Sequence, residues 1–503
     1  MPTSQKHPFL ILTISLVIGI VLYIYTELQI SLYVTIIVAL ILIIIKFSKT
    51  LKEALIIIFL VLYGCSMSYY KLKSEEFEKL ITIEGICSSY IGGNGYLVLS
   101  KLGNIYLSKY NILFYLKKKS NPKTKAKEIN KQIPLEGDSI KFQCKLKRTN
   151  FSSNQFDKYL KYAGIKYKTK FITSFTILSK NHITISRKIQ KYFISKIDSL
   201  YKDNTVSAII KAICIGDRTT ISSETKNLFT ITGCVHLLAV SGLHVGAIFL
   251  LISNLLKLIP IKKKYIELIC LPCIWIYTLI TGASPSAIRA SIIITFIILG
   301  KSFNKDDNKL NILFASAFLT LIINPMMLCN ISFQLSYSAY TGIILFYKPL
   351  SLFLQKKLKL HRIIANAMSI CTSAQILITP LSFYYFKDVN ITSIIINTII
   401  MPLTAPLLYT SVITLLLPYK ISFFLAIIPD FISRLLITIL NLLSHIVYNI
   451  HIENISVLHI LFTYFTILSL FSLIIKRNKK MLITTYIALI TQTFYSCLYN
   501  LII

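Results

Sequence analysis

Residues 233–246 read GCVHLLAVSGLHVG and open an apolar stretch that continues to Leu256. A membrane span needs about 20 apolar residues, but it has no structural need for two histidines, a serine and three glycines so close together. As one helix, the stretch would place His236 and His244 about 80° apart, so both could face one cavity. We expect the helix to break at Ser241-Gly242. Such breaks often mark a binding site in membrane proteins, and a packing notch with two interfacial histidines is the alternative.

The composition is that of a membrane protein with many spans. Of the 503 residues 54% are hydrophobic, and 54 lysines and arginines against 20 acidic residues give a formal net charge of +34. The ten cysteines show no CxxC or Cys/His spacing, so the sequence predicts neither a metal site nor a cofactor. We expect residues 9–25 to be a retained span, because no small-residue cleavage site follows them.

Thirteen apolar segments have about the length of a spanning helix. They are 9–25, 28–45, 54–70, 236–256, 265–281, 286–300, 310–325, 333–348, 363–384, 391–418, 421–446, 457–475 and 481–503. The positive-inside rule places the N-terminus in the cytoplasm, together with the basic connections 257–264, 301–309, 348–362, Lys420 and 476–480. The segment 421–446 is ambiguous, because Asp430 and Arg434 form either an intramembrane pair or part of an interfacial helix.

Residues 71–186 lack long apolar runs and alternate as β-strands do. In GDSIKFQCKLKR, at 137–148, apolar positions alternate with basic ones, and GYLVLS, NIYLS, ILFYL and KYKTKFITSF are further strands. We expect an extracytoplasmic barrel of five or six strands, with an OB-type barrel as the leading choice. Cys87 and Cys144 fall on predicted core faces, so a disulfide and two unpaired thiols both remain open.

This β domain is strongly basic. Residues 71–180 hold 22 lysines and arginines and 8 acidic residues, which favours a polyanionic partner over a merely solvated lysine coat. The candidate binding surface is the outer face of the strand at 137–148, with Lys141, Lys145, Lys147 and Arg148.

Residues 187–232 predict two helices that lie at the outer membrane surface. The first, SRKIQKYFISKIDSLY, is basic and amphipathic, and the second ends at Gly216. The domain order is therefore 1–70 transmembrane, 71–186 OB-like, 187–232 at the surface and 233–503 polytopic. The fold class is mostly α, a polytopic membrane protein with an inserted small all-β domain.

Two outward loops, TGASPSAIRA at 281–290 and NPMMLCNISFQLS at 324–336, lie on the same side as the opening stretch. Ser284 predicts a helix N-cap and Pro285 the first helical residue. Arg289 then lies near a helix N-terminus, where the dipole disfavours a cation. Asp217 or a passing phosphate would compensate it, and snorkelling to the interface is the alternative.

Two polar stripes follow on later helices. Gln334 aligns with Ser338 and Thr341, and Gln375 aligns with Thr372 and Thr379. Such stripes either join helices by hydrogen bonds or line a polar conduit.

Several motifs together resemble the membrane domain of the ComEC competence family. They are GDR at 216–218, HLLAVSGLHVG at 236–246, TGASPSAIRA, FQLSYSA at 333–339 and SAQILITPLSFYYF at 373–386. NQFDKYLKYAGI at 154–165 resembles a segment of that family's OB-like region. The family's motif positions correspond to Asp217, Arg218, His236, Ser241, Gly242, His244, Arg289, Gln334 and Gln375.

The resemblance implies a channel that passes single-stranded DNA across the bacterial cytoplasmic (inner) membrane during natural transformation, formed by one chain or by a homodimer. Many members carry a C-terminal metallo-β-lactamase-like domain, whose HxHxDH motif is not found in these 503 residues. We therefore expect a separate nuclease to degrade the second strand. The sequence has no GxxxxGK[ST] motif, so a cytoplasmic helicase or motor is expected to supply the energy. An external DNA receptor is a further expected partner.

Two other functions stay open at this point. His236, Ser241 and His244 could act together on a phosphodiester or lipid-linked substrate, because histidines near a serine can do acid/base work, which would make the chain a membrane enzyme. The same basic character would also suit an exporter of another polyanion.

Overall fold

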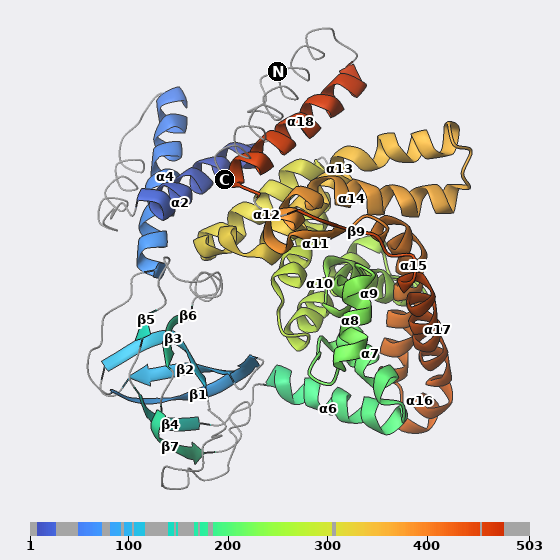
Figure 1. The fold of residues 1–503 in the computed structure, drawn as a ribbon, viewed down its shortest axis with the longest axis horizontal. Coiled ribbons are helices and arrows are strands. Elements are labelled where there is room, and N and C mark those ends of the chain that lie inside the picture. Colours follow the sequence, from blue (N-terminus) through green and yellow to red (C-terminus); the bar gives the residue numbers. More distant parts are fainter. Residues whose placement is uncertain are drawn as a thin grey trace. The chain divides into compact units, whose positions relative to one another are not determined.

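The computed structural model describes residues 8–26, 49–72, 81–91, 95–102, 105–115, 139–144, 147–148, 165–169, 172–179, 185–303, 308–452 and 455–476. The chain divides into two compact units (Figure 1). Unit 1 comprises 1–189 and 314–330, and unit 2 comprises 190–313 and 331–503.

Unit 1 contains a tightly packed pair of helices, α2 (Pro8–Thr26) and α4 (Lys49–Leu72). A Cβ added at Gly19 would collide with the carbonyl of Val61, and one at Gly64 would lie 2.6 Å from the carbonyl of Leu16. Close approach at small residues is how helices associate in a bilayer, where apolar side chains gain little from leaving lipid.

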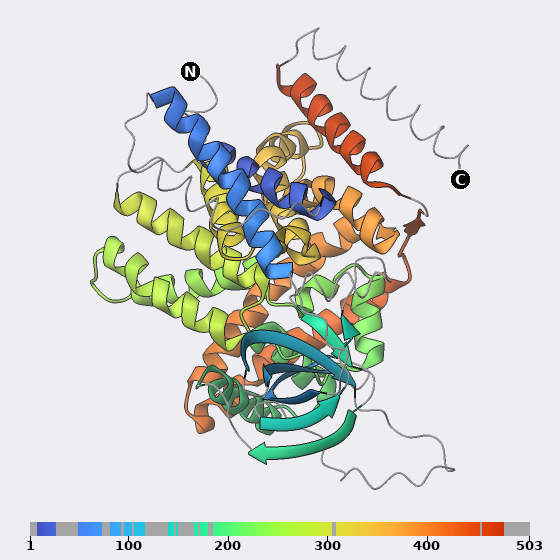
Figure 2. The ribbon, with the colours of Figure 1, turned by 90° about the vertical axis from the view of Figure 1, so that its left-hand side faces the viewer.

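The same unit contains a seven-stranded sheet, whose strands are strongly curved in Figure 2. Its strands are β1 (Ile81–Ile91), β2 (Gly95–Leu102), β3 (Ile105–Tyr115), β4 (Ser139–Cys144), β5 (Lys147–Arg148), β6 (Ile165–Thr169) and β7 (Ile172–Ser179). The order is β5-β6-β3-β2-β1-β4-β7, and only β3 and β6 run parallel. The number differs from the expected five or six. The predicted strands NIYLS and ILFYL form the single strand β3, KYKTKFITSF is divided between β6 and β7, and the two-residue β5 is added.

The strand register contradicts the disulfide between Cys87 and Cys144. Cys144 lies opposite Ile81 in the pairing of β1 with β4, whereas Cys87 lies six residues further along β1. At about 3.3 Å per residue this separates the two positions by roughly 20 Å. A disulfide needs Cα atoms within about 7 Å, so the two cysteines do not form one.

Unit 2 is a bundle of helices. They are α6 (Ile185–Leu200, from Gln190 onward), α7 (Asn204–Ile215), α8 (Ser223–Ile231), α9 (Gly242–Leu256), α10 (Lys263–Ile280), α11 (Pro285–Ser302), α13 (Ile331–Lys356), α14 (Arg362–Phe386), α15 (Ser393–Leu416), α16 (Tyr419–Leu425), α17 (Ile427–Ser444) and α18 (Val457–Lys476), while α12 (Lys309–Ile323) continues into unit 1. A short two-stranded sheet pairs β8 (Asp388–Asn390) with β9 (Asn449–His451).

Nine of the eleven predicted spans within the described residues each coincide with one helix. The span 236–256 contains a 3₁₀ turn and α9, and the span 421–446 contains α16 and α17. The spans 28–45 and 481–503 lie outside the described residues. Among the described helices, four stretches are long and apolar enough to cross a membrane: α11, α14, α15 and Tyr419–Ser444. The chain is therefore a mostly helical membrane protein, and the total of thirteen spans stays a prediction.

Helix α7 is buried in the core of unit 2. Ten consecutive residues, 206–215, are buried, and they share an apolar core with α15 and α17. The charge of Lys211 is paired with Asp198 of α6. Gly216 ends the helix as predicted, with a left-handed φ of 78°. The sequence indicated a surface helix, but α7 is buried from Val206 to Ile215, with Ser207 and the neutralised Lys211 as its only polar residues in that stretch.

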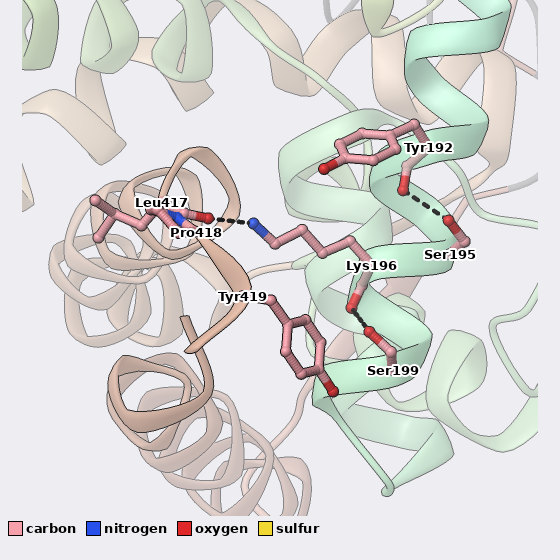
Figure 3. A pocket seen from close by; sticks show the side chains of 7 residues that line it. All are labelled: Tyr192, Ser195, Lys196, Ser199, Leu417, Pro418 and Tyr419. Atoms are coloured by element: carbon pink, nitrogen blue, oxygen red, sulfur yellow. Dashed lines mark hydrogen bonds between the residues drawn. The ribbon is translucent and has the colours of Figure 1, made fainter. Parts of the chain in front are cut away.

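Helix α6 lies against the C-terminal end of α15 (Figure 3). Lys196 Nζ donates to the carbonyl oxygens of Leu415, at 2.9 Å, and Leu417, at 2.5 Å. The loop charges had assigned α6 to the outer side and the neighbouring Lys420 to the cytoplasm. If α15 spans the bilayer, these two assignments contradict each other, because α6 and Lys420 both lie at the C-terminal end of α15.

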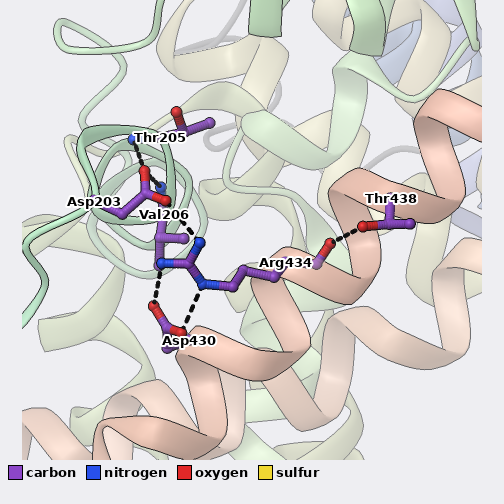
Figure 4. A network of polar contacts seen from close by, with 6 residues as sticks. All are labelled: Asp203, Thr205, Val206, Asp430, Arg434 and Thr438. Carbon is purple, nitrogen blue, oxygen red and sulfur yellow. Dashed lines mark hydrogen bonds and ion pairs between the residues drawn. The ribbon is translucent and has the colours of Figure 1, made fainter.

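An ionic network joins α17 to the start of α7 (Figure 4). Arg434 Nε donates to Asp430 at 2.9 Å, and Arg434 Nη1 lies 2.9 Å from Asp203 Oδ2. Asp203 is also the N-cap of α7, accepting from the backbone N–H of Thr205 at 2.8 Å. Asp430 and Arg434 do form an ion pair, and it extends to a third group that is distant in sequence. The choice between an intramembrane pair and an interfacial helix stays a prediction.

We expect Gly342→Ala to destabilise the packing of α13 against α14. A Cβ at Gly342 would collide with the carbonyl of Ser373, and overpacking of this kind costs about 1–3 kcal/mol. Gly246→Ala is the control, because nothing lies within 4 Å of its added Cβ. Thermal unfolding of the purified full chain in detergent measures both variants, and an equal response would contradict the close contact.

The Asp203 carboxylate makes stability depend on pH. Backbone N–H groups, chiefly that of Thr205, and Arg434 lower the pKa of Asp203 below its ordinary value. The contribution of Asp203 to folding stability is therefore fully present above the ordinary aspartate pKa. It is lost as the pH falls through the lowered pKa of the folded state.

We expect Asp203→Asn, which keeps a capping side chain, to be less stable than wild type at pH 7. The difference in unfolding free energy should narrow as the pH falls to about 3. Glu224→Gln, on an exposed residue of α8, should stay within about 0.5 kcal/mol of wild type. A difference for Asp203→Asn that is constant over this pH range would contradict the ionic role.

Candidate functional site

The opening stretch is broken as expected, but in two places. A short 3₁₀ turn covers Val235–Leu238, Ala239 and Val240 are not helical, and α9 starts at Gly242 with Ser241 as its N-cap. His236 and His244 therefore do not share one helix. The side chain of His236 is exposed, whereas that of His244 is 2% exposed. The two rings nevertheless lie near enough to interact electrostatically, and a cavity that both face stays a prediction.

The predicted motif segments converge on Val240. Ser284 and Ser286, in the first turn of α11, donate hydrogen bonds to the Val240 carbonyl at 3.0 and 2.8 Å. Gly216 of the GDR segment approaches the Val240 side chain, where an added Cβ would lie at 3.2 Å. Three loops that the sequence placed on one side of the membrane therefore meet at one residue.

His244 binds the N–H of the peptide bond between Val240 and Ser241, whose carbonyl accepts from Ser284 and Ser286. Its Nδ1 accepts from the backbone N–H of Ser241 at 3.1 Å and lies 2.9 Å from the Ser241 hydroxyl. A ring nitrogen that accepts is unprotonated, so the bonding pattern assigns the proton of the neutral ring to Nε2. This Nε2 is buried and has no partner among the described residues.

The Ser241–His244 pair resembles a catalytic dyad, but the same arrangement begins α18. There His459 Nδ1 accepts from the backbone N–H of Ser456 at 3.2 Å and lies 2.9 Å from its hydroxyl. In both places serine precedes histidine by three residues at a helix N-terminus, as in a capping box. The geometry favours a capping role over nucleophilic catalysis.

Arg289 lies in the second turn of α11, after the predicted N-cap Ser284 and Pro285. Its side chain is 4% exposed, and its guanidinium lies over the ring of Tyr337 at 4.9 Å from the centroid. Nη2 reaches the Ser286 carbonyl only at 3.5 Å, and Nη1 has no partner in the described part of the chain. A buried cation without a carboxylate is costly, and snorkelling does not describe so enclosed a group.

Asp217, the expected compensating acid, binds elsewhere. Its carboxylate accepts from the backbone N–H and the hydroxyl of Thr219, at 3.0 and 2.8 Å. The neighbouring Arg218 side chain is exposed. Arg289 therefore has no acidic partner among the described residues. The GDR segment contributes to the site through the turn at Gly216 and its close packing against Val240.

The two glutamines join helices. Tyr385 donates to Gln334 Oε1 at 2.7 Å, between α14 and α13, and Gln375 Nε2 donates to the Ser393 hydroxyl at 3.4 Å, between α14 and α15. These bonds favour interhelical attachment, one of the two alternatives for the polar stripes.

The basic candidates of the β domain belong to unit 1. The side chain of Lys141 on β4 is exposed as predicted. Lys147 and Arg148 form the short β5, and Lys145 lies outside the described residues.

Sequence patterns missed two groups that shape the site. One is Tyr337, the ring under Arg289, which was hidden within an apolar helix. The other is Asn390, whose Nδ2 donates to the Ile231 carbonyl at 2.7 Å and holds the end of α8. An aromatic residue three positions after Gln334 is the only sequence signal for Tyr337.

Comparison with known proteins agrees with the motif order. A model of the family described as "Competence protein" matches residues 213–477, which is more than half of the chain. No solved structure matches.

Among curated relatives, "ComE operon protein 3" of Bacillus subtilis (strain 168) is 28% identical over 214 residues, which are 42% of this chain and 26% of that protein. "Recombination protein 2" of Haemophilus influenzae is 22% identical over 227 residues, 42% of this chain and 29% of that protein. An uncharacterized protein of Aquifex aeolicus (strain VF5) is 29% identical over 187 residues, 37% of this chain and 44% of the relative. The matched part spans less than half the length of each relative.

We expect Ser241→Ala and Ser456→Ala to have similar effects. Each removes one hydroxyl that pairs with a histidine at a helix start, which costs about 1 kcal/mol. Thermal unfolding of the two purified variants measures this cost. The capping role would be contradicted if Ser241→Ala had normal stability and lost turnover of a phosphodiester while Ser456→Ala kept it. That result would restore the enzyme hypothesis.

Proposed function

Because the chain belongs to the competence protein family, we propose that it is a membrane channel that passes single-stranded DNA across the bacterial cytoplasmic membrane during natural transformation. The relatives' names, "ComE operon protein 3" and "Recombination protein 2", are compatible with a role in DNA uptake. The DNA strand, the membrane and the external receptor, nuclease and helicase are parts of this proposal.

The observation that carries the proposal is the unpaired guanidinium of Arg289. It is 4% exposed and has no acidic partner among the described residues. A buried, unpaired charge costs several kcal/mol unless an anion or further donors and acceptors compensate it. The phosphate of a passing strand would supply that charge, and its oxygens fit the planar guanidinium.

A second unpaired donor lies on the neighbouring helix. Helices α9 and α11 pack together, and an added Cβ at Gly242 would lie 3.4 Å from the Cβ of Ala290, next to Arg289. His244 Nε2, on the same turn as Gly242, carries a proton and has no partner among the described residues. Two buried donors without an acceptor favour an anionic, acceptor-rich substrate.

The proposed site would bind a strand weakly enough to let it pass. The Tyr337 ring already offsets part of the charge of Arg289, because the face of an aromatic ring attracts a cation. A single arginine at the path would recognise each phosphate in turn without holding the strand, as many arginines together would.

The β domain would gather the strand. Its strand order, with β1 between β2 and β4 and with β3 parallel to β6, supports the OB-type barrel that we propose. Basic residues such as Lys141 would bind DNA by releasing counterions, so the affinity would fall steeply with salt. OB-type barrels commonly bind single strands in this way.

We expect Arg289→Gln to lower DNA uptake by about tenfold or more, because a hydrogen bond to a charged group contributes about 1.5–3 kcal/mol. Entry of labelled single-stranded DNA into the cytoplasm is measured in a deletion strain that expresses the full chain. Arg289→Lys should keep part of the activity, since it retains the charge but loses the planar fork.

Lys257→Gln is the matched control, because this lysine is exposed and bonds only to Asn254 among the described side chains. Equal uptake by wild type and a normally expressed Arg289→Gln chain would overturn the site. Normal DNA uptake by the deletion strain, together with loss of a surface polymer, would identify an exporter instead.

A further inference from the structure

The outer face of α6 is basic and aromatic. Tyr192, Ser195 and Ser199 recur at helical spacing, so they share one face. Lys191 lies next to Tyr192, and all four side chains are exposed. Tyr192 is 62% exposed. The single acid of the helix, Asp198, is paired with Lys211. This face therefore presents positive charge beside an exposed ring.

A cleft of about 250 Å³ lies between this face and the loop that joins α15 to α16. Figure 3 shows Tyr192 and Tyr419 on either side of Lys196. The Lys196 ammonium donates to the carbonyls of Leu415 and Leu417. An ammonium has three N–H donors, so one donor remains for a ligand.

The two serines of the cleft offer acceptors. The Ser195 hydroxyl donates to the Tyr192 carbonyl and the Ser199 hydroxyl donates to the Lys196 carbonyl, each at 2.8 Å. Their protons are thus directed into the helix, and their lone pairs remain. A matching ligand combines an anionic group for Lys196 with hydroxyl donors for the serines.

Exposed apolar side chains follow Tyr419 along α16 and α17. Phe424 is 78% exposed, Ile427 71% and Phe431 64%. Exposed apolar surface of this extent marks contact with a membrane or another protein. Tyrosines and lysines at its edge are the residues that occupy the level of the lipid headgroups.

We propose that the cleft between α6 and α16 is a phosphatidylglycerol site. The phosphate accepts from Lys196 and is attracted by Lys191 and Lys420, while the two glycerol hydroxyls donate to Ser195 and Ser199. The acyl chains lie along the strip from Phe424 to Phe431. The cleft is separate from the proposed DNA path, and the lipid site stands whether or not the chain carries DNA.

The test uses the full chain in nanodiscs that contain equal amounts of phosphatidylglycerol and phosphatidylethanolamine. Native mass spectrometry after release counts the lipids that remain bound. We expect wild type to retain phosphatidylglycerol in preference to phosphatidylethanolamine. Ser195→Ala with Ser199→Ala removes both acceptors but keeps the Lys196 bonds to α15, so it should lower that preference by about tenfold.

A second variant tests the tyrosine wall. Tyr192→Ala should lower retention of phosphatidylglycerol, whereas Tyr265→Ala should not. Tyr265 is the matched control, since it is 57% exposed and follows three lysines on a different helix.

Three results would overturn the proposal. The double serine variant could keep the wild-type lipid preference, or Tyr265→Ala could lose as much phosphatidylglycerol as Tyr192→Ala, which indicates adsorption without a site. The third result is that wild type binds a single-stranded oligonucleotide while the serine and Tyr192 variants lose this binding and keep the lipid. That result would assign the cleft to nucleic acid.

Discussion

The peptide bond between Val240 and Ser241 must keep its polar groups paired although the helix is interrupted there. An unpaired carbonyl or N–H in apolar surroundings costs several kcal/mol, and water does not compensate it. Two serine hydroxyls of α11 satisfy the carbonyl, and the His244 ring satisfies the N–H. The break therefore requires α11 to begin at this point, and Gly216 has room to approach because it has no side chain.

The placement of charge follows from the same low-dielectric setting. In the described part of unit 2, Lys211 is neutralised by Asp198 and Arg434 by two aspartates, while Lys196 donates to helix-end carbonyls. These groups join α6, α7, α15 and α17 into one body. Arg289 differs, since it has an aromatic ring beneath it and no acid. A cation that the fold leaves uncompensated is the feature that a transported polyanion would use.

The lipid proposal and the DNA proposal use different faces of unit 2. One depends on an enclosed guanidinium between α11 and α13, and the other on an open cleft beside α16. Fixed contacts hold α6 at the end of α15, so a lipid in that cleft would secure the level of the bundle in the bilayer. Conduction and anchoring can thus be tested by separate variants.

The sequence alone determined what depends on neighbouring residues. Apolar runs located the helices, Ser284 with Pro285 and Gly216 marked helix ends, and Ser241-Gly242 marked the break, because caps and breaks follow from local backbone chemistry. The tertiary structure alone decided the partners of those elements. It set Tyr337 under Arg289, buried α7, joined the glutamines to other helices, moved α6 to the end of α15 and separated Cys87 from Cys144. Such contacts depend on helix rotation, crossing and strand register between distant segments, which no local pattern encodes.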